Sequence, residues 1–209
     1  MIINKKLNCG VRIAMEEISY VQSVSVGIWV KAGSVDETAK NSGISHFIEH
    51  MLFKGTKNRS AKKIAEDVDK IGGQINAFTG KEATCYYLKT LANNIDKAAD
   101  ILIDMFINSR FDEDEMEKEK RVVCEEIKMI EDSPEDDAHD IISELVFKGN
   151  PLAKPIIGTP KSLQGITRNA IKKYISEEYT RDNIVISVCG SLNPDHVCEL
   201  FDSKLMALN

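Results

Sequence analysis

The chain has 209 residues, and its 43% hydrophobic content is sufficient for a sizeable core in one large domain or two small ones. The formal net charge is −6, and no stripe of Lys and Arg is interleaved with aromatic residues, which argues against a nucleic-acid partner. No apolar run approaches membrane-spanning length, and the five cysteines are scattered without a Cys-x-x-Cys pair, so we expect a cytoplasmic protein with no membrane partner.

Strand and helix patterns alternate in pairs along the chain. Val24, Val26, Ile28 and Val30 recur at every second position and predict a strand. This pairing, without an internal repeat or linker, favours an α+β fold in one domain, 1–209, with an antiparallel or mixed sheet and helices packed mainly on one face. The predicted elements, in chain order, are strands over 11–18 and 24–30, helices over 45–53 and 60–71, strands over 75–79 and 83–91, helices over 94–109, 112–133, 135–147 and 167–178, a strand over 183–189, and a final helix from about 193 to the end.

The first predicted helix carries His46, Glu49 and His50 in a His-x-x-Glu-His pattern. At about 100° per residue, the two histidines fall one turn apart on one helix face, with the glutamate at its edge. Zinc hydrolases need this combination of neutral imidazoles, a coordination position open to water and a carboxylate near that water. The alternative is a solvated pair of histidines on an amphipathic helix, whose apolar face would be formed by Ile44, Ile48, Met51 and Leu52.

The acidic helix predicted over 112–133 offers candidates for a third ligand. Glu117 and Glu125 point away from its apolar side and should be solvated. Glu119 and Glu126 are two turns apart and lie at the edge of the apolar stripe, where a carboxylate is costly unless a cation or hydrogen-bond donors satisfy it. One of them would bind zinc, and the other would orient a histidine or balance charge. Spacing does not rank the two, and both could instead reach solvent.

Further segments carry a family resemblance: 43–56, 73–87 with its Asn76-Ala77-Phe78-Thr79, and 155–159. Together with the motif, they resemble the N-terminal half of the pitrilysin-type metallopeptidases (inverted zincins, M16). The most similar group is that of the mitochondrial processing peptidase β subunit and its bacterial relatives. In that family, a downstream Glu is the third zinc ligand, and a second Glu seven residues before it is also needed for function. The resemblance therefore implies Zn²⁺ held by His46, His50 and Glu126, with Glu119 as the second functional glutamate.

The same resemblance implies a zinc endopeptidase mechanism. Glu49 would take a proton from the zinc-bound water as it attacks a peptide carbonyl, and would return it to the leaving amine. Asn76 and Ala77 would belong to an edge strand to which an extended peptide substrate adds by main-chain hydrogen bonds. From its residue type alone, Asn76 could equally be a turn or edge residue without a substrate role.

Members of this family form a chamber from two homologous halves, and the C-terminal half supplies an Arg and a Tyr for catalysis. This chain resembles the first half alone. We expect a fragment, or a chain that works with a C-terminal half, a partner subunit or a second copy. The isolated chain could then bind zinc and still be weakly active or inactive.

Two other functions remain open. One is a non-catalytic subunit of a protease-like assembly, and the other is a structural metal-binding domain, which would normally fill all four zinc positions with protein. Glu49 separates them from a peptidase, because only a peptidase needs it for turnover. His139 and His196 lack partners at ligand spacing and are not expected to bind metal, and Tyr86 and Tyr87 are expected to pack in the sheet.

Overall fold

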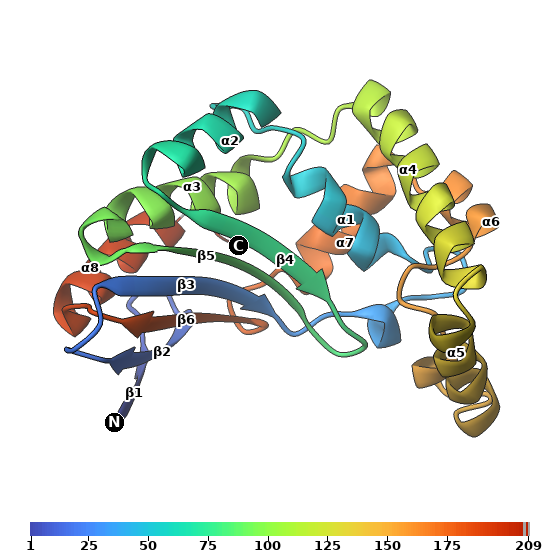
Figure 1. Cartoon of the computed structure of the whole chain (residues 1–209), viewed down its shortest axis with the longest axis horizontal. Coiled ribbons are helices and arrows are strands. Elements are labelled where there is room, and N and C mark those ends of the chain that lie inside the picture. The colour runs from blue at the N-terminus through green and yellow to red at the C-terminus, as the bar shows by residue number, and fades with distance from the viewer. Residues whose placement is uncertain (207, 209) are drawn as a thin grey trace.

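The computed structural model describes residues 1–206 and 208 and contains a six-stranded mixed sheet. Across the sheet the strands follow the order β1-β2-β6-β3-β5-β4 (Figure 1). All neighbouring strands are antiparallel except β2 and β6, which are parallel. The strands are β1 (Ile2–Lys6), β2 (Arg12–Glu17), β3 (Ser23–Val30), β4 (Gln74–Thr79), β5 (Thr84–Leu91) and β6 (Ile184–Gly190).

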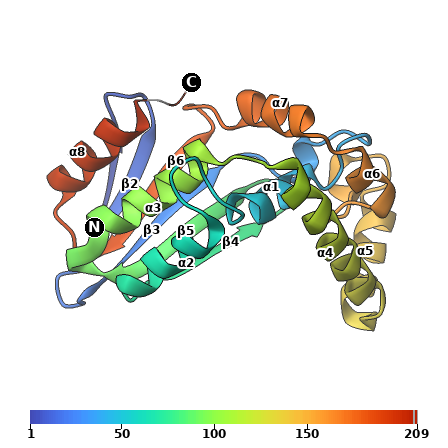
Figure 2. The ribbon, with the colours of Figure 1, turned by 90° about the horizontal axis from the view of Figure 1, so that it is seen from above.

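Eight α-helices accompany the sheet in this part of the chain. In both views, α4 and α5 lie beyond one end of the sheet (Figures 1 and 2). None of the described helices combines the length and the apolar character needed to cross a membrane. The helices are α1 (Ile44–Leu52), α2 (Ala61–Lys70), α3 (Ile95–Asn108), α4 (Glu113–Glu131), α5 (Pro134–Val146), α6 (Pro160–Gly165), α7 (Arg168–Glu178) and α8 (Pro194–Leu205).

The sheet buries one of its faces beneath helices. In β3, Val24, Val26 and Ile28 are fully buried, whereas Trp29 points to the other face and is 37% exposed. Helix α3 packs on β3 and β5, α8 packs on β2, and α1 and α2 pack on β4. The alternation seen in the sequence therefore separates a covered face from an open one, and the predicted fold class is confirmed.

One strand, β1, and one α-helix, α6, were not predicted from the sequence. Four of the five β1 residues are exposed, so Ile2–Lys6 shows no alternation of buried and exposed positions. Helix α6 has only six residues, Pro160–Gly165, and its start overlaps Gly158-Thr159-Pro160, which is typical of a loop. The predicted final helix ends at Leu205, and its last positions, 207 and 209, lie outside the described residues.

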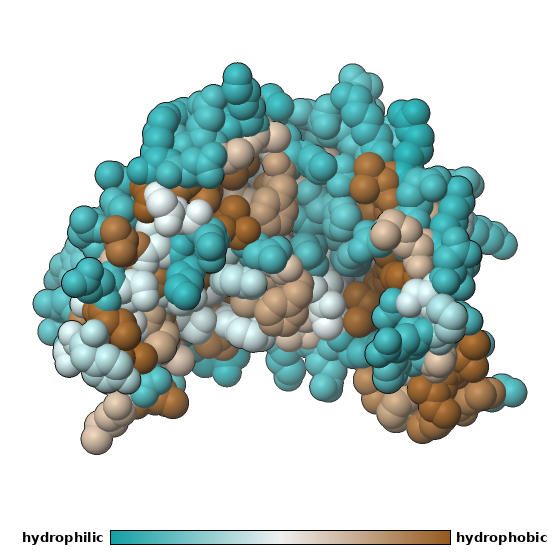
Figure 3. Space-filling model, viewed as in Figure 1, coloured by the Kyte–Doolittle hydropathy of each residue, from teal (hydrophilic) through white to brown (hydrophobic). Residues whose placement is uncertain are grey.

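Helix α5 has an uncovered apolar side. Helix α4 ends at Glu131, shortly before Pro134, which is the first residue of α5. A proline is tolerated there because the first N–H of a helix has no partner within the helix. None of the residues of α5 is buried. Apolar side chains are visible over this helix in the space-filling view (Figure 3). The exposed apolar residues of α5 and its C-terminal boundary are Ile141, Ile142, Leu145, Val146 and Phe147.

Candidate metal centre

Helix α1 turns two imidazoles away from the core. Its apolar residues follow the helical period and pack into the core, whereas His46 and His50 are only partly buried, with their ring centroids 4.5 Å apart. The two histidines share a helix face opposite the apolar residues, as the helical spacing predicts. The buried residues of α1 are Ile44, Ser45, Phe47, Ile48, Met51 and Leu52.

The N-terminus of α1 is held by a buried carboxylate. Glu37, only 3% exposed, accepts the backbone N–H of Gly43 at 2.7 Å and that of Ser45 at 2.9 Å. Burial raises the pKa of Glu37, and these two N–H groups oppose the rise. Lys154 also donates to the backbone carbonyl of Glu37. Glu37 therefore accepts N–H groups at the start of α1 and helps to fix where the helix that carries His46 begins.

Helix α4 packs on α1 and presents Glu126 to both histidines. Its Oε1 lies 3.8 Å from Nε2 of His46, and its Oε2 lies 3.5 Å from Nε2 of His50. One donor atom from each of these three residues lies within 4.8 Å of the other two. Across residues 1–206 and 208, no other set of three His, Cys, Asp or Glu side chains reaches this spacing.

These distances fit a zinc ion. Two nitrogen or oxygen donors on one tetrahedral zinc, each about 2.1 Å from the metal, lie about 3.4 Å from each other. Burial, with the nearby charge of His50, lowers the pKa of His46 to about 4, so its imidazole is neutral at physiological pH, as a ligand must be. The donor set of two imidazoles and one carboxylate is that of zinc hydrolases. The residues present therefore fit this metal.

Glu119 faces the other nitrogen of His50. Its Oε1 lies 2.8 Å from Nδ1 of His50, and its Oε2 lies 2.6 Å from Nζ of Lys54. Burial alone would raise the pKa of Glu119, but the hydrogen bonds from His50 and Lys54 lower it. Glu119 is therefore placed to orient His50, while Glu126 is placed to bind metal.

The same contacts act on His50 itself. Burial lowers its pKa, but the hydrogen bond with Glu119 and the charge of Glu126 outweigh burial and raise the pKa overall. Metal binding at Nε2 must therefore displace a proton that His50 holds more tightly than His46 does.

Glu49 lies on the same helix, beside the metal-binding set. Its Oε2 accepts a hydrogen bond from Oγ1 of Thr79 at 2.5 Å. Burial raises the pKa of Glu49, and the Thr79 hydroxyl and the charge of His50 oppose this rise. A half-buried carboxylate with an elevated pKa next to a metal site has the chemistry of a general base.

Strand β4 lies at the edge of the sheet and carries Asn76 and Ala77. Asn76 is exposed, and its Oδ1 accepts the backbone N–H of Ala77 at 2.9 Å. The outer side of β4 has no partner strand within the described part of the chain. Because α1 packs on β4, this open edge and Glu49 belong to the same corner of the molecule.

The remaining candidates lie away from this site. His139 is exposed on α5, and Nε2 of His196 pairs with Asp96 at 3.0 Å. Tyr86 is buried, and its hydroxyl lies 3.0 Å from that of Tyr179.

Sequence reasoning missed three residues that contact the site: Glu37, Lys54 and Thr79. Lys54 is four residues after His50 and continues the face of the two histidines, so helical spacing could have revealed it. Thr79 lies two residues after Ala77, on the same side of a predicted strand. For Glu37, the sequence offers no comparable periodic signal.

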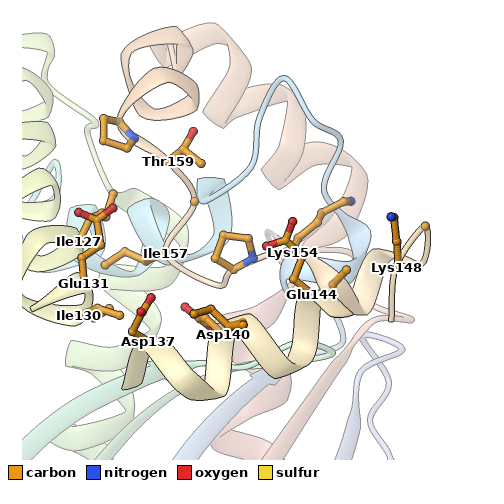
Figure 4. Close-up of a pocket in the computed structure, with 16 residues that line it drawn as sticks. Ile127, Ile130, Glu131, Asp137, Asp140, Glu144, Lys148, Lys154, Ile157 and Thr159 are labelled. Atoms are coloured by element: carbon orange, nitrogen blue, oxygen red, sulfur yellow. The ribbon is translucent and has the colours of Figure 1, made fainter. Parts of the chain in front are cut away.

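A hollow of 570 Å³ lies between α5, the C-terminal part of α4 and the segment 153–160. In Figure 4, the carboxylates of Asp137, Asp140 and Glu144 line it from α5, and Ile127, Ile130 and Ile157 form its apolar side. No histidine lines this hollow, and among the described residues its carboxylates belong to no set of three possible metal donors. The hollow is therefore distinct from the metal centre.

Comparisons with known proteins identify relatives of this chain. A family model described as insulinase (peptidase family M16) matches residues 12–160. An uncharacterized zinc protease of Bacillus subtilis, YmxG, is 48% identical over 195 residues, which are 92% of this chain and 48% of YmxG. The mitochondrial-processing peptidase subunit beta of Dictyostelium discoideum is 38% identical over 199 residues, which are 95% of this chain and 42% of that protein.

A solved structure supports the same relationship. The crystal structure of a protease from Helicobacter pylori superposes with a TM-score of 0.94 at 28% identity, covering 100% of this chain and 51% of that one. This chain spans about half the length of the relatives it matches. The resemblance seen in the sequence is confirmed, and the chain belongs to the insulinase family of peptidases, peptidase family M16.

Proposed function

We propose that this chain is the zinc-binding half of an endopeptidase that hydrolyses extended, unstructured peptides. One observation carries the proposal: α1 and α4 bring His46, His50 and Glu126 together, with Glu49 on the same helix as the histidines. Relatives named as zinc proteases support zinc as the metal of this site.

The chain's own residues divide the chemistry. His46, His50 and Glu126 would hold Zn²⁺. When bound, this ion would act as a Lewis acid and lower the pKa of a coordinated water to about 7. Glu49 would receive a proton on its carboxylate as the peptide carbonyl is attacked, and would give it to the leaving amine. Glu119 would keep His50 oriented through Nδ1.

The peptide would bind along β4. An extended segment can add to an exposed sheet edge by main-chain hydrogen bonds, and β4 offers such an edge at Asn76 and Ala77. Binding through the backbone selects peptides that lack structure of their own, because a folded segment cannot present a free strand. This selects for conformation more than for sequence.

A second half would complete the active site. The related protease from Helicobacter pylori is about twice as long as this chain, which is consistent with a two-half arrangement. We propose that a homologous C-terminal half, a partner subunit or a second copy of the chain covers the site and shields it from bulk solvent.

The test combines metal content with peptide cleavage. The chain should bind one zinc ion and should cleave an unstructured fluorogenic peptide when a homologous C-terminal half is added. Glu49→Gln should keep the zinc and lower kcat by at least about 100-fold, because a positioned general base contributes on the order of 10²- to 10⁴-fold. A wild-type protein that binds zinc but cleaves no peptide, alone or with the C-terminal half, would contradict the proposal. A structural role for the metal would then remain.

A further inference from the structure

The hydroxyl group of Thr79 links the sheet edge to the proposed base. Thr79 is the last residue of β4, and its Oγ1 donates to Oε2 of Glu49 at 2.5 Å. In the described part of the chain, no other side chain makes a hydrogen bond to this carboxylate. One oxygen of Glu49 is therefore held, and Oε1 is left without such a partner.

A glutamate carboxylate needs this kind of restraint to act as a base. Its side chain has several rotatable bonds, and an unrestrained carboxylate samples many orientations. Proton transfer requires the accepting oxygen to lie within hydrogen-bond reach of the donor, so each unproductive orientation lowers the rate. A single hydroxyl on a rigid strand can remove much of this freedom.

Thr79 is itself rigidly placed. It pairs with Thr84 of β5, and the turn that follows is bonded to the loop ahead of α1, where the N–H of Ser34 donates to the carbonyl of Gly80 at 3.3 Å. A Cβ on Gly33 would lie 2.5 Å from that carbonyl oxygen, so this close approach requires glycine. The end of β4 and the loop leading into α1 are thus fastened together.

The same strand carries the open edge. Exposed and half-buried residues alternate along β4, and Ala77 and Thr79 are both half-buried on one side, whereas Asn76 is exposed on the other. Because α1 packs on β4, the side with Thr79 is the one from which Glu49 is reached. Any displacement of β4 would therefore also move the hydroxyl that holds Glu49.

We propose that Thr79 is a positioning residue whose hydroxyl fixes one oxygen of Glu49, frees the other for proton transfer, and ties the orientation of the base to the strand on which the peptide binds. This inference rests on the proposed peptidase function. It differs from a purely structural role, because threonine also suits a strand by its β-branched shape alone.

The substitutions Thr79→Val and Thr79→Ser separate these roles. Valine keeps the β-branched shape without the hydroxyl, and serine keeps the hydroxyl. In the zinc-loaded protein, assembled with its complementary half, T79V should lower kcat about 10- to 100-fold, the effect of one hydrogen bond to a charged group. KM and zinc content should stay unchanged, and T79S should restore most of kcat.

Thr90→Val is the matched control. Thr90 lies at the other end of β5, where its hydroxyl donates to the backbone carbonyl of Ile71 at 2.7 Å. T90V removes a threonine hydroxyl from the same hairpin without touching Glu49. It should destabilise the protein without changing kcat.

A second readout does not depend on turnover. In the metal-free protein, T79V should lower the urea midpoint of unfolding in the wild-type background but not in a Glu49→Ala background, because the pair is then already broken. Equal effects in both backgrounds would overturn the proposed contact.

Four kinetic results would each overturn the positioning role. These are a wild-type kcat in T79V, equal losses of kcat in T79V and T79S, equal losses of kcat in T79V and T90V, and a change in KM alone. A wild-type protein that binds zinc but cleaves no peptide would instead remove the proposed function itself, while the unfolding measurement would still report on the contact.

Discussion

Oε1 of Glu119 lies 2.8 Å from Nδ1 of His50, and the carboxylate that makes this contact is almost completely buried. The ring of His50 is thereby held with its other nitrogen toward Glu126, at 3.5 Å. A metal-binding histidine commonly has its far nitrogen fixed in this way, which sets both the tautomer and the direction of the ring. The contact therefore belongs to the candidate metal centre, although Glu119 lies outside the three possible donors.

Removing this carboxylate should weaken metal binding. We expect Glu119→Ala to lower the zinc affinity about 10- to 100-fold, the usual effect of losing such a partner. Competition with a chromophoric chelator measures the change. Glu117→Ala is the control, because Glu117 is exposed on the same helix and pairs only with Lys120. Equal affinities in the two variants would contradict the orienting role.

Lys54 balances the charge of Glu119. Lys54→Met would leave a carboxylate that is 5% exposed without its cation, so the free energy of unfolding of the metal-free protein should fall by about 1–3 kcal/mol. Urea denaturation measures this loss. Adding Glu119→Gln should recover part of it, since a neutral amide needs no counter-charge. Lys118→Met, at an exposed pair with Glu115, should change stability by less than about 0.5 kcal/mol. A loss in K54M no larger than in K118M would show that Lys54 does not stabilise Glu119.

Glu126 and its neighbour Glu125 offer a matched pair for the metal site. Glu126→Gln removes an anionic donor that faces both histidines, so the stoichiometric zinc of the wild type should be lost after dialysis. Glu125→Gln should retain it, because Glu125 is exposed and pairs with Lys128. Elemental analysis of the dialysed proteins gives the answer, and zinc retained by E126Q would exclude Glu126 as a ligand.

The stability of the metal-free protein should depend on pH through His46. Its pKa is about 4 in the folded chain, below the ordinary value of 6.5, so the unfolded chain binds the extra proton between these values. Stability from this group is present above pH 6.5 and is lost as the pH falls toward 4, by up to about 3 kcal/mol. Urea denaturation at pH 7 and pH 4.5 measures it.

His46→Gln is the reference for this measurement, because other carboxylates titrate in the same range. The difference in unfolding free energy between the wild type and H46Q should become less favourable to the wild type at the lower pH. A difference that does not change with pH would mean that His46 is not buried as a neutral ring.

Much of the candidate metal centre could be predicted from the sequence because its parts obey helical spacing. His46, Glu49 and His50 share one helix, and Glu119 and Glu126 share another, so each group could be placed on a face. Which glutamate meets the metal could not be derived, because that depends on how α4 crosses α1. The ranking came from the family resemblance instead.

The contacts that support the site follow a different logic. Glu37 meets Ser45 through a loop, and Thr79 meets Glu49 across 30 positions of sequence. Such contacts carry no period, and only the fold brings them together. The parallel pairing of β2 with β6 is of the same kind, because the strands are far apart in the chain and their local patterns do not specify a neighbour.

The position of β6 also sets the order in which the sheet can be assembled. This strand lies between β2 and β3, although it follows both by more than 150 residues. Before β6 has inserted, the β1-β2 pair and the β3-β5-β4 unit each have an unpaired edge where β6 will lie. The apolar face of the sheet then has a gap between β2 and β3. A sheet that formed during synthesis before residues 184–190 left the ribosome would therefore be open and prone to aggregate until these residues inserted between β2 and β3.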